Sequence, residues 1–175
     1  GFRELPSEDR NIQALVIDER GHSFINTAGR FYHANLDSVV TEVGIESQGG
    51  AELNRKLTKG GAFARSARGE LLDKSEKLRG IGAYWNSKYS GASVSTLIAH
   101  RTGTEMPVEY SYNVRIPSFL SPAGGNAAFP AFIVSSDYYR EYGMMKSRVS
   151  PVRISSGWTS DTVVRFTIPR GWDIA

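Results

Sequence analysis

Histidine, serine and carboxylate side chains are the groups in this 175-residue chain that could perform acid–base or nucleophilic chemistry. The three histidines, His22, His33 and His100, lie far apart, and no His-x-x-x-His or Glu-x-x-His pattern occurs. A metal site needs several ligands held in a fixed geometry. We therefore predict no metal site and no bound cofactor.

The catalytic patterns of hydrolases are also missing. The chain has no cysteine, which excludes disulfides, thiolate metal ligands and a cysteine nucleophile within it, and no Gly-x-Ser-x-Gly elbow. We predict that this chain is not itself an enzyme. A small hydrolase stays open as an alternative. A cleft that brings His100 or His33 within about 3 Å of a serine hydroxyl and a carboxylate would favour it.

Carboxylates recur at helical spacing in Glu70, Asp73 and Glu76, but Lys74 and Lys77 lie between them. Paired carboxylates for acid–base catalysis would not need such interleaved cations. The pattern is typical of an exposed helix face with salt bridges.

Segment 54–88 is basic, with nine cations, three anions and a net charge of +6. A basic helical face could track a phosphate backbone. Phe63 and Trp85, however, fall on apolar stripes and are expected in the core rather than stacked on bases. We predict a solvated face, or one docked on an acidic neighbouring domain, and no nucleic-acid partner. The cations are Arg55, Lys56, Lys59, Arg65, Arg68, Lys74, Lys77, Arg79 and Lys88.

Aromatic residues near the C-terminus form the possible binding surface: Tyr138, Tyr139, Trp158 and Trp172. If they form one exposed patch, they could bind a polysaccharide or a protein. Burial in a sheet core is the other reading of such residues.

The strands that must position these groups are indicated by period-2 alternation. In 108–116 (VEYSYNVRI) every second residue is β-branched or aromatic, which predicts a half-buried central strand. Segment 39–47 alternates too, and after the turn at 48–50 the chain returns through 51–58 as a β-hairpin. We expect 92–101 to pair antiparallel with 108–116.

Two helices are predicted between the hairpin and the 92–101 strand. Phe63, Ala67 and Leu71 recur at four-residue spacing. Asp73 lies three residues before Glu76, as in a capping box, and opens a second helix over 74–89.

Shorter elements complete the pattern. We predict a strand at 12–17, a linker with little regular structure at 21–35, and a loop at 117–130. A brief strand at 131–135, a helical turn or aromatic strand at 137–145, and strands at 149–154 and 161–168 follow. The predicted fold is α+β, a mainly antiparallel β-sheet or sandwich with a two-helix insertion packed on one face. Residues 1–35 are expected to end a preceding domain, and 36–175 to form a single accessory domain.

Composition and charge limit the class of protein further. The net charge is only +3, and 40% of the residues are hydrophobic, as in globular chains. The longest apolar run (AAFPAFIV) is far below the roughly 20 residues that span a bilayer. Because the chain starts at Gly1 without Met, we expect it to be a fragment of a longer polypeptide.

One ordered series of motifs resembles a known family. VEYSYNVRIPSF, the apolar AFPAFIV, the basic-flanked SRVSPVRI and WTSDTVVRFTIPRGWDI resemble the C-terminal β-rich region of bacterial transglutaminase-like proteins. ALVID near the N-terminus resembles the tail of their papain-fold core. Relatives continue where this chain ends, so the resemblance implies that a last strand follows Ala175.

The resemblance implies a non-catalytic role for this chain. The family's catalytic Cys, His and Asp lie upstream of the matching region, so no catalytic residue is carried over to this chain. It implies a non-catalytic accessory or interaction domain of a protease-like, transglutaminase-like protein, and its partner is the neighbouring transglutaminase-like core. It also implies export to the periplasm or outside the cell. The alternatives left open are a polysaccharide- or protein-binding module and the small hydrolase.

Overall fold

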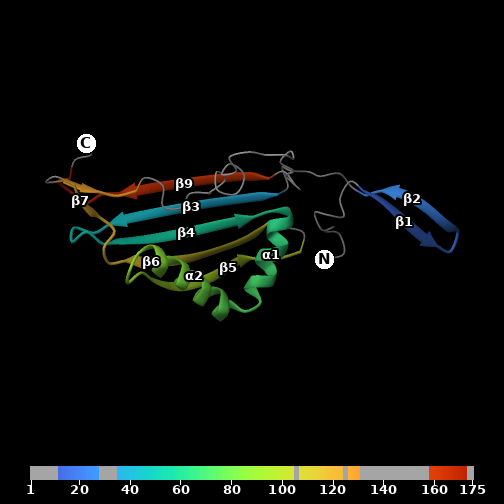
Figure 1. The fold of residues 1–175 in the computed structure, drawn as a ribbon, viewed down its shortest axis with the longest axis horizontal. Coiled ribbons are helices and arrows are strands. Elements are labelled where there is room, and N and C mark those ends of the chain that lie inside the picture. The colour runs from blue at the N-terminus through green and yellow to red at the C-terminus, as the bar shows by residue number, and fades with distance from the viewer. Residues whose placement is uncertain (1–11, 28–34, 105–106, 124–125, 131–157, 173–175) are drawn as a thin grey trace, which may run out of the picture.

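A five-stranded sheet and two helices form the two layers of the main body (Figure 1). The computed structural model describes residues 12–27, 35–104, 107–123, 126–130 and 158–172. The strand order is β5-β6-β4-β3-β9. The main-body elements are β3 (Leu36–Ile45), β4 (Ala51–Lys59), α1 (Gly61–Leu71), α2 (Lys74–Lys88), β5 (Ser93–Arg101), β6 (Val108–Ile116) and β9 (Thr159–Thr167).

The sheet is mixed, with one parallel pair. The β3–β4, β4–β6 and β5–β6 pairs are antiparallel, whereas β9 runs parallel to β3. This confirms the α+β class and both predicted antiparallel pairs. The predicted central position of 108–116 is wrong by one place, because β4 lies in the middle and β6 lies between β4 and β5.

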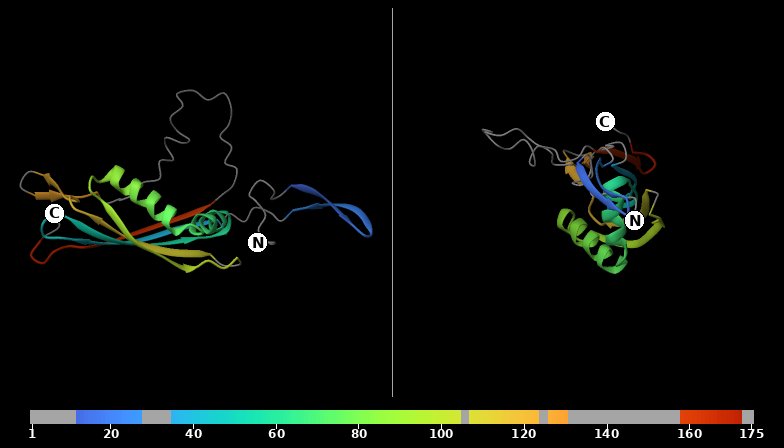
Figure 2. Two further views of the ribbon diagram at one scale, coloured as in Figure 1. Left: turned by 90° about the horizontal axis from the view of Figure 1, so that it is seen from below. Right: turned by 90° about the vertical axis from the view of Figure 1, so that its right-hand side faces the viewer.

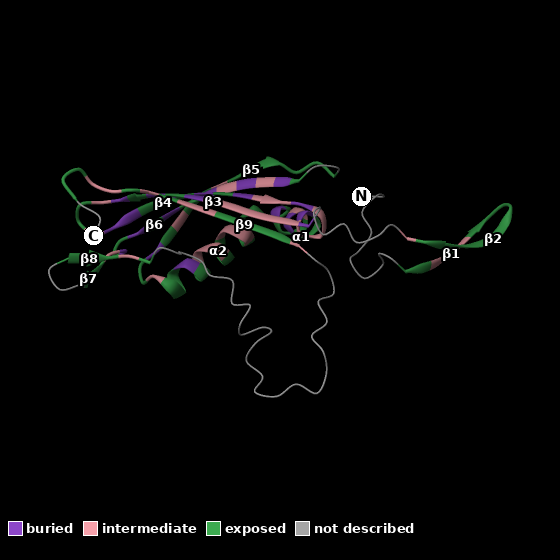
Figure 3. Cartoon of the chain, turned by 90° about the horizontal axis from the view of Figure 1, so that it is seen from above, coloured by how far each residue is buried: buried purple, intermediate pink, exposed green. Residues whose placement is uncertain are grey.

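The helices cover one face of the sheet, as Figure 2 shows in edge view. On that face the alternating residues are buried, and Figure 3 shows the buried segments gathered in the central strands under the helices. The predicted inner face of β6 is confirmed, since all five of its alternating residues are buried. They are Val108, Tyr110, Tyr112, Val114 and Ile116.

Helix α2 begins where the capping pattern predicts. The Asp73 carboxylate accepts hydrogen bonds from the backbone N–H groups of Ser75 and Glu76, at 3.1 and 3.0 Å. These bonds satisfy two of the donors that a helix start leaves unpaired. The helix inserts Trp85 into the core, where its side chain is 0% exposed.

Ring contacts extend the core from α2 to the far edge strand. Trp85 stacks near Tyr89, Tyr89 lies near Phe119, and Phe129 joins Phe119 to Phe166 of β9. The centroid distances along this series are 4.7 to 6.0 Å. The aromatic series therefore ties the last strand to the helix layer.

A separate hairpin precedes the main body. β1 (Gln13–Asp18) pairs with β2 (Gly21–Asn26), so the prediction of a linker with little regular structure over 21–35 is wrong for its first half. Asp18 accepts a hydrogen bond from the Arg20 N–H at 2.8 Å, and Gly21 adopts a φ of 123°. These two features form a tight turn that reverses the chain into β2. The sequence predicts that a strand ends here, but it does not predict the second strand after the turn.

A second small hairpin lies within the predicted loop 117–130. β7 (Ser121–Ala123) pairs with β8 (Asn126–Ala128). The prolines suggested a loop, but Pro122 sits in a strand of only three residues. The elements predicted at 131–135, 137–145 and 149–154 lie outside the described residues.

Edge strand β5 is interrupted by two bulges. Thr96 and Leu97 together face the single residue Tyr112, and His100 is the extra residue between the Ala99 and Arg101 pairs. Thr96 is the non-glycine residue with positive φ among those described, at 58°. Bulges twist an edge strand away from further pairing, which protects it from aggregation.

Replacing Thr96 by Gly is expected to raise the free energy of unfolding by about 1 kcal/mol, because a β-branched residue is strained in the left-handed region. Urea unfolding followed by circular dichroism measures the change. Thr96→Ala keeps the Cβ and should gain much less. A Thr96→Gly variant that is less stable than wild type would contradict the bulge geometry.

Candidate functional site

A cavity lies between the helix layer and the sheet. Its volume is about 440 Å³, and six of its lining residues are Glu70, Lys77, Gly80, Ile81, Tyr84 and Tyr112. A smaller hollow of about 220 Å³ adjoins it and shares Glu70 and Lys77. The two glycines of α2 have open space where a Cβ would be, and Gly80 lines the cavity.

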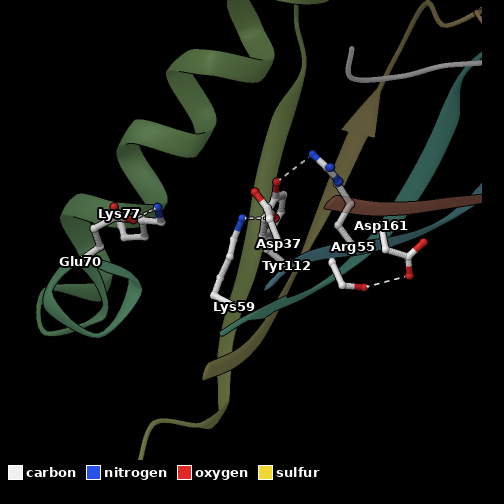
Figure 4. A network of polar contacts seen from close by, with 8 residues as sticks. Asp37, Arg55, Lys59, Glu70, Lys77, Tyr112 and Asp161 are labelled. Carbon is white, nitrogen blue, oxygen red and sulfur yellow. Dashed lines mark hydrogen bonds and ion pairs between the residues drawn. The ribbon is translucent and has the colours of Figure 1, made fainter. Parts of the chain in front are cut away.

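An ion pair stands at the junction of the two hollows. Lys77 of α2 pairs with Glu70 of α1, and the Lys77 ammonium lies 5.9 Å from the ring centroid of Tyr110 (Figure 4). Ser66 also donates to Glu70 at 3.1 Å. The hydrogen bond and charge of Lys77 hold the pKa of Glu70 below its usual 4.5. Burial and the neighbouring Tyr112 raise the pKa of Tyr110, which therefore stays protonated at neutral pH.

Arg55 is a buried cation beneath α2. It occupies an inward position of β4 between Leu53 and Leu57, and its side chain is only 6% exposed. Its register partners on the two neighbouring strands supply the hydrogen-bond acceptors. Arg55 Nε donates to Thr41 Oγ1 at 3.2 Å, and Nη1 donates to Tyr112 Oη at 3.1 Å (Figure 4).

Two aromatic rings enclose this guanidinium. Its carbon lies 5.3 Å from the Trp85 centroid and 5.8 Å from the Tyr112 centroid. Within the part of the chain that the structure describes, no carboxylate pairs with Arg55. Its partners there, Thr41, Tyr112 and Trp85, are all neutral. Cation–π attraction compensates the burial of the charge only in part.

Trp85 adds an unpaired donor to the same cluster. Its indole Nε1–H is buried and has no hydrogen-bond partner among the described residues. A buried donor without a partner is uncommon in folded proteins, because its desolvation is not compensated. We call Thr41, Arg55, Trp85 and Tyr112 the Arg55 cluster.

The basic segment does not form one charged face. Arg55 points into the core, whereas Lys56, the next residue, pairs with Glu109 on the other face of the sheet. Others are held in ion pairs, as in Lys59–Asp37 and Arg79–Glu76. The prediction of one solvated face over this segment is therefore wrong, because Arg55 is buried and the described cations lie on both faces of the sheet. The absence of a nucleic-acid partner stays a prediction.

A histidine and a serine meet on the uncovered face of the sheet. His100 Nε2 lies 2.7 Å from Ser111 Oγ, and His100 is the extra residue at the second bulge of β5. This is the nucleophile–base distance of a hydrolase. In the described ranges no carboxylate contacts His100, and nearby Glu109 pairs with Lys56 and Arg101. One of the two contacts that the hydrolase alternative needs is therefore present.

A second hollow, of about 610 Å³, is larger than the helix-side cavity. Residues of all five strands of the sheet line it, including Ser93, Ser95 and Asn113. Neither His100 nor Ser111 lines this hollow or the helix-side cavity.

The predicted aromatic surface is only partly described. Tyr138 and Tyr139 lie outside the described residues, as does His33. Trp158 is half-buried and Trp172 exposed, and they flank opposite ends of the nine-residue β9, roughly 30 Å apart at the usual strand rise. The structure does not bring these two tryptophans together.

His22 lies on the isolated β1–β2 hairpin, far in sequence from His100. Among the described residues, no three metal-ligating side chains come together. Neither described helix has the length and apolar character to cross a membrane.

Comparison with known proteins adds no relative: no family model, no curated protein and no solved structure matches the chain. The likeness to transglutaminase-like proteins therefore rests on the sequence motifs alone.

The lowered pKa of Glu70 gives a pH dependence with a defined sign. The pair with Lys77 stabilises the fold above pH 4.5, and this contribution is lost as the pH falls through the lower folded-state pKa. Glu70→Gln is expected to lower the free energy of unfolding by less than about 1 kcal/mol at pH 7, because the Glu70 side chain is 45% exposed and solvent screens the pair. Denaturation with urea at a series of pH values measures this.

The difference between wild type and Glu70→Gln should vanish in acid. Glu52→Gln, on the uncovered face, is the matched control for removal of one negative charge. If Glu70→Gln lowers the free energy of unfolding by the same amount from pH 7 to pH 2, the lowered pKa of Glu70 in the folded state is contradicted.

Proposed function

We propose that this chain is a non-catalytic interaction domain of a larger transglutaminase-like protein, a putative protease, and that it packs beside the reactive core of that protein. The β1–β2 hairpin is the observation that carries the proposal. It stands apart from the main sheet in Figure 1, and it pairs only within itself among the described strands.

The hairpin exposes apolar side chains on both of its faces. Leu15, Ile17 and Phe24 share one face and are 51%, 75% and 64% exposed, and Ile25 on the other face is also exposed. An isolated two-stranded ribbon is marginally stable in water. Contiguous apolar residues in such a ribbon are typical of a surface that docks on another domain.

The neighbouring core is the partner that fits this hairpin best. β1 contains the ALVID run, the part of this sequence that resembles the tail of the transglutaminase-like core. A hairpin that belongs to the edge of a neighbouring domain would have its apolar faces covered there. By the same resemblance we propose that the protein is exported, to the periplasm or beyond the cell.

Hydrogen exchange tests the docking of the hairpin. In the 175-residue chain, β1 and β2 amides should exchange almost as fast as in an unfolded peptide, while β4 amides are protected. In the natural polypeptide that contains this chain, the hairpin amides should become protected as well. Equal exchange of the hairpin in both proteins would contradict the proposal.

A double variant separates docking from stability. Ile17→Ser with Phe24→Ser should leave the unfolding free energy of the main body within about 0.5 kcal/mol of wild type, because the hairpin packs separately. The same variant should abolish the added protection in the natural polypeptide. Glu19→Ser, in the hairpin turn, is the control that should retain it.

A small hydrolase is the second candidate, and the 2.7 Å contact between His100 and Ser111 is the observation that favours it. The two candidates differ in the reactivity of Ser111. With a fluorophosphonate reagent we expect no adduct on Ser111, as judged by mass spectrometry of the native chain. An adduct that disappears in His100→Gln would contradict the non-catalytic proposal and support the hydrolase.

A further inference from the structure

We propose that the Arg55 cluster is a binding site for an apolar monocarboxylate, with the carboxylate on Arg55 and Trp85 and the apolar body in the cavity beside Tyr112. The inference is independent of the docking role proposed above. It rests on an excess of hydrogen-bond donors over acceptors in this cluster, in which Trp85 Nε1–H is the donor that is fully buried without a partner among the described residues.

The donor excess is found on two side chains. A guanidinium has five N–H donors, and Arg55 uses Nε toward Thr41 and Nη1 toward Tyr112. No described residue accepts from its Nη2, and none accepts from Trp85 Nε1–H. These donors belong to groups whose ring and guanidinium centres lie 5.3 Å apart. The cluster therefore lacks both an acceptor and a negative charge.

A carboxylate supplies both of these missing features. Its two oxygens can accept from two different donors, and charge-assisted bonds to arginine are stronger than neutral ones. The aromatic faces of Trp85 and Tyr112 already hold the guanidinium in place. The site is thus organised before the anion arrives, which reduces the cost of binding.

The surroundings favour a single negative charge on an apolar body. Glu70, Glu76 and Lys77 line the adjoining cavity, so two carboxylates stand against one ammonium and a second negative charge on the ligand is disfavoured. Ile81, Tyr84 and Tyr112 provide apolar and aromatic walls. Tyr112 connects the two parts, because its ring lines the cavity while its hydroxyl accepts from Arg55.

Sodium benzoate is the probe, compared with sodium chloride at equal ionic strength, in the 175-residue chain. The indole N–H resonances of Trp85, Trp158 and Trp172 are followed by NMR, with Trp85→Phe for assignment. We expect the Trp85 resonance to shift and saturate while the other two stay in place. Sodium acetate should bind more weakly, because it lacks the apolar body, and neutral benzamide should produce no saturating shift.

Matched variants test each half of the site. Arg55→Lys keeps the positive charge but removes the planar fork, and should weaken benzoate binding at least about tenfold. Lys56→Met, the neighbouring residue on the opposite face, should bind as wild type does. Gly80→Leu fills the cavity and should weaken benzoate binding more than acetate binding. Gly82→Leu is its control, since Gly82 has the same open space but does not line the cavity.

Two results would overturn the inference. One is a Trp85 resonance that responds to benzoate no more than to chloride. The other is a saturating response that Arg55→Lys and Gly80→Leu leave unchanged. If Arg55→Lys does not fold, the Gly80→Leu and Gly82→Leu pair still decides the result.

Discussion

The burial of Trp85 is the contact on which the two-layer structure depends. Trp85 is the fully buried side chain that α2 contributes to the core, whereas apolar residues of α2 such as Ile81 are only partly buried. Tertiary packing supplies most of the stability of helices in proteins, so the helix depends on this contact to remain on the sheet. The indole anchors the helix to the sheet by contact with the Arg55 guanidinium of β4. Arg55, in turn, is kept from water by the ring it supports, so the anchor and the buried charge depend on each other.

Much of the main body could be predicted because one face of the sheet is covered and the other is not. That asymmetry imposes strict alternation on β4 and β6, and the alternation was visible in the sequence. The start of α2 was equally predictable, because Asp73 caps it through local bonds. Strand β1 could be predicted from its apolar run, but its partner β2 could not, because no residue of β2 is buried and a strand without a buried face shows no alternation to detect. The order of strands was also out of reach: the parallel pairing of β9 with β3 joins residues more than a hundred positions apart, and no local pattern specifies it.

The candidate site was less predictable than the fold. Arg55 lies on the same face as Leu53 and Leu57, so the alternation of β4 did place it inside, but it was counted among the surface cations of its segment. A charge at an inward position between two leucines is the signal that identifies it. The contact between His100 and Ser111 had no such signal, because it joins side chains of two strands whose exact register, with bulges at 96–97 and 100, no local pattern specifies. The cations of the basic segment lie on both faces of the sheet because successive residues of a paired strand point to opposite faces. The composition of the segment does not reveal this arrangement.

The parallel pairing of β9 has a consequence for how the chain is made. β3 is complete early in synthesis, and β4 pairs with it at once through a short turn, but its other edge waits for residues 123 positions further along, as between Ser38 and Asp161. A ribosome that adds about 5 to 20 residues each second needs several seconds to supply them. During that interval β3 presents unpaired backbone groups to any other nascent strand nearby. Closing so long a loop also slows the final step, because contacts distant in sequence form late. The arrival of β9 therefore ends the interval in which this edge of β3 is open to misassembly.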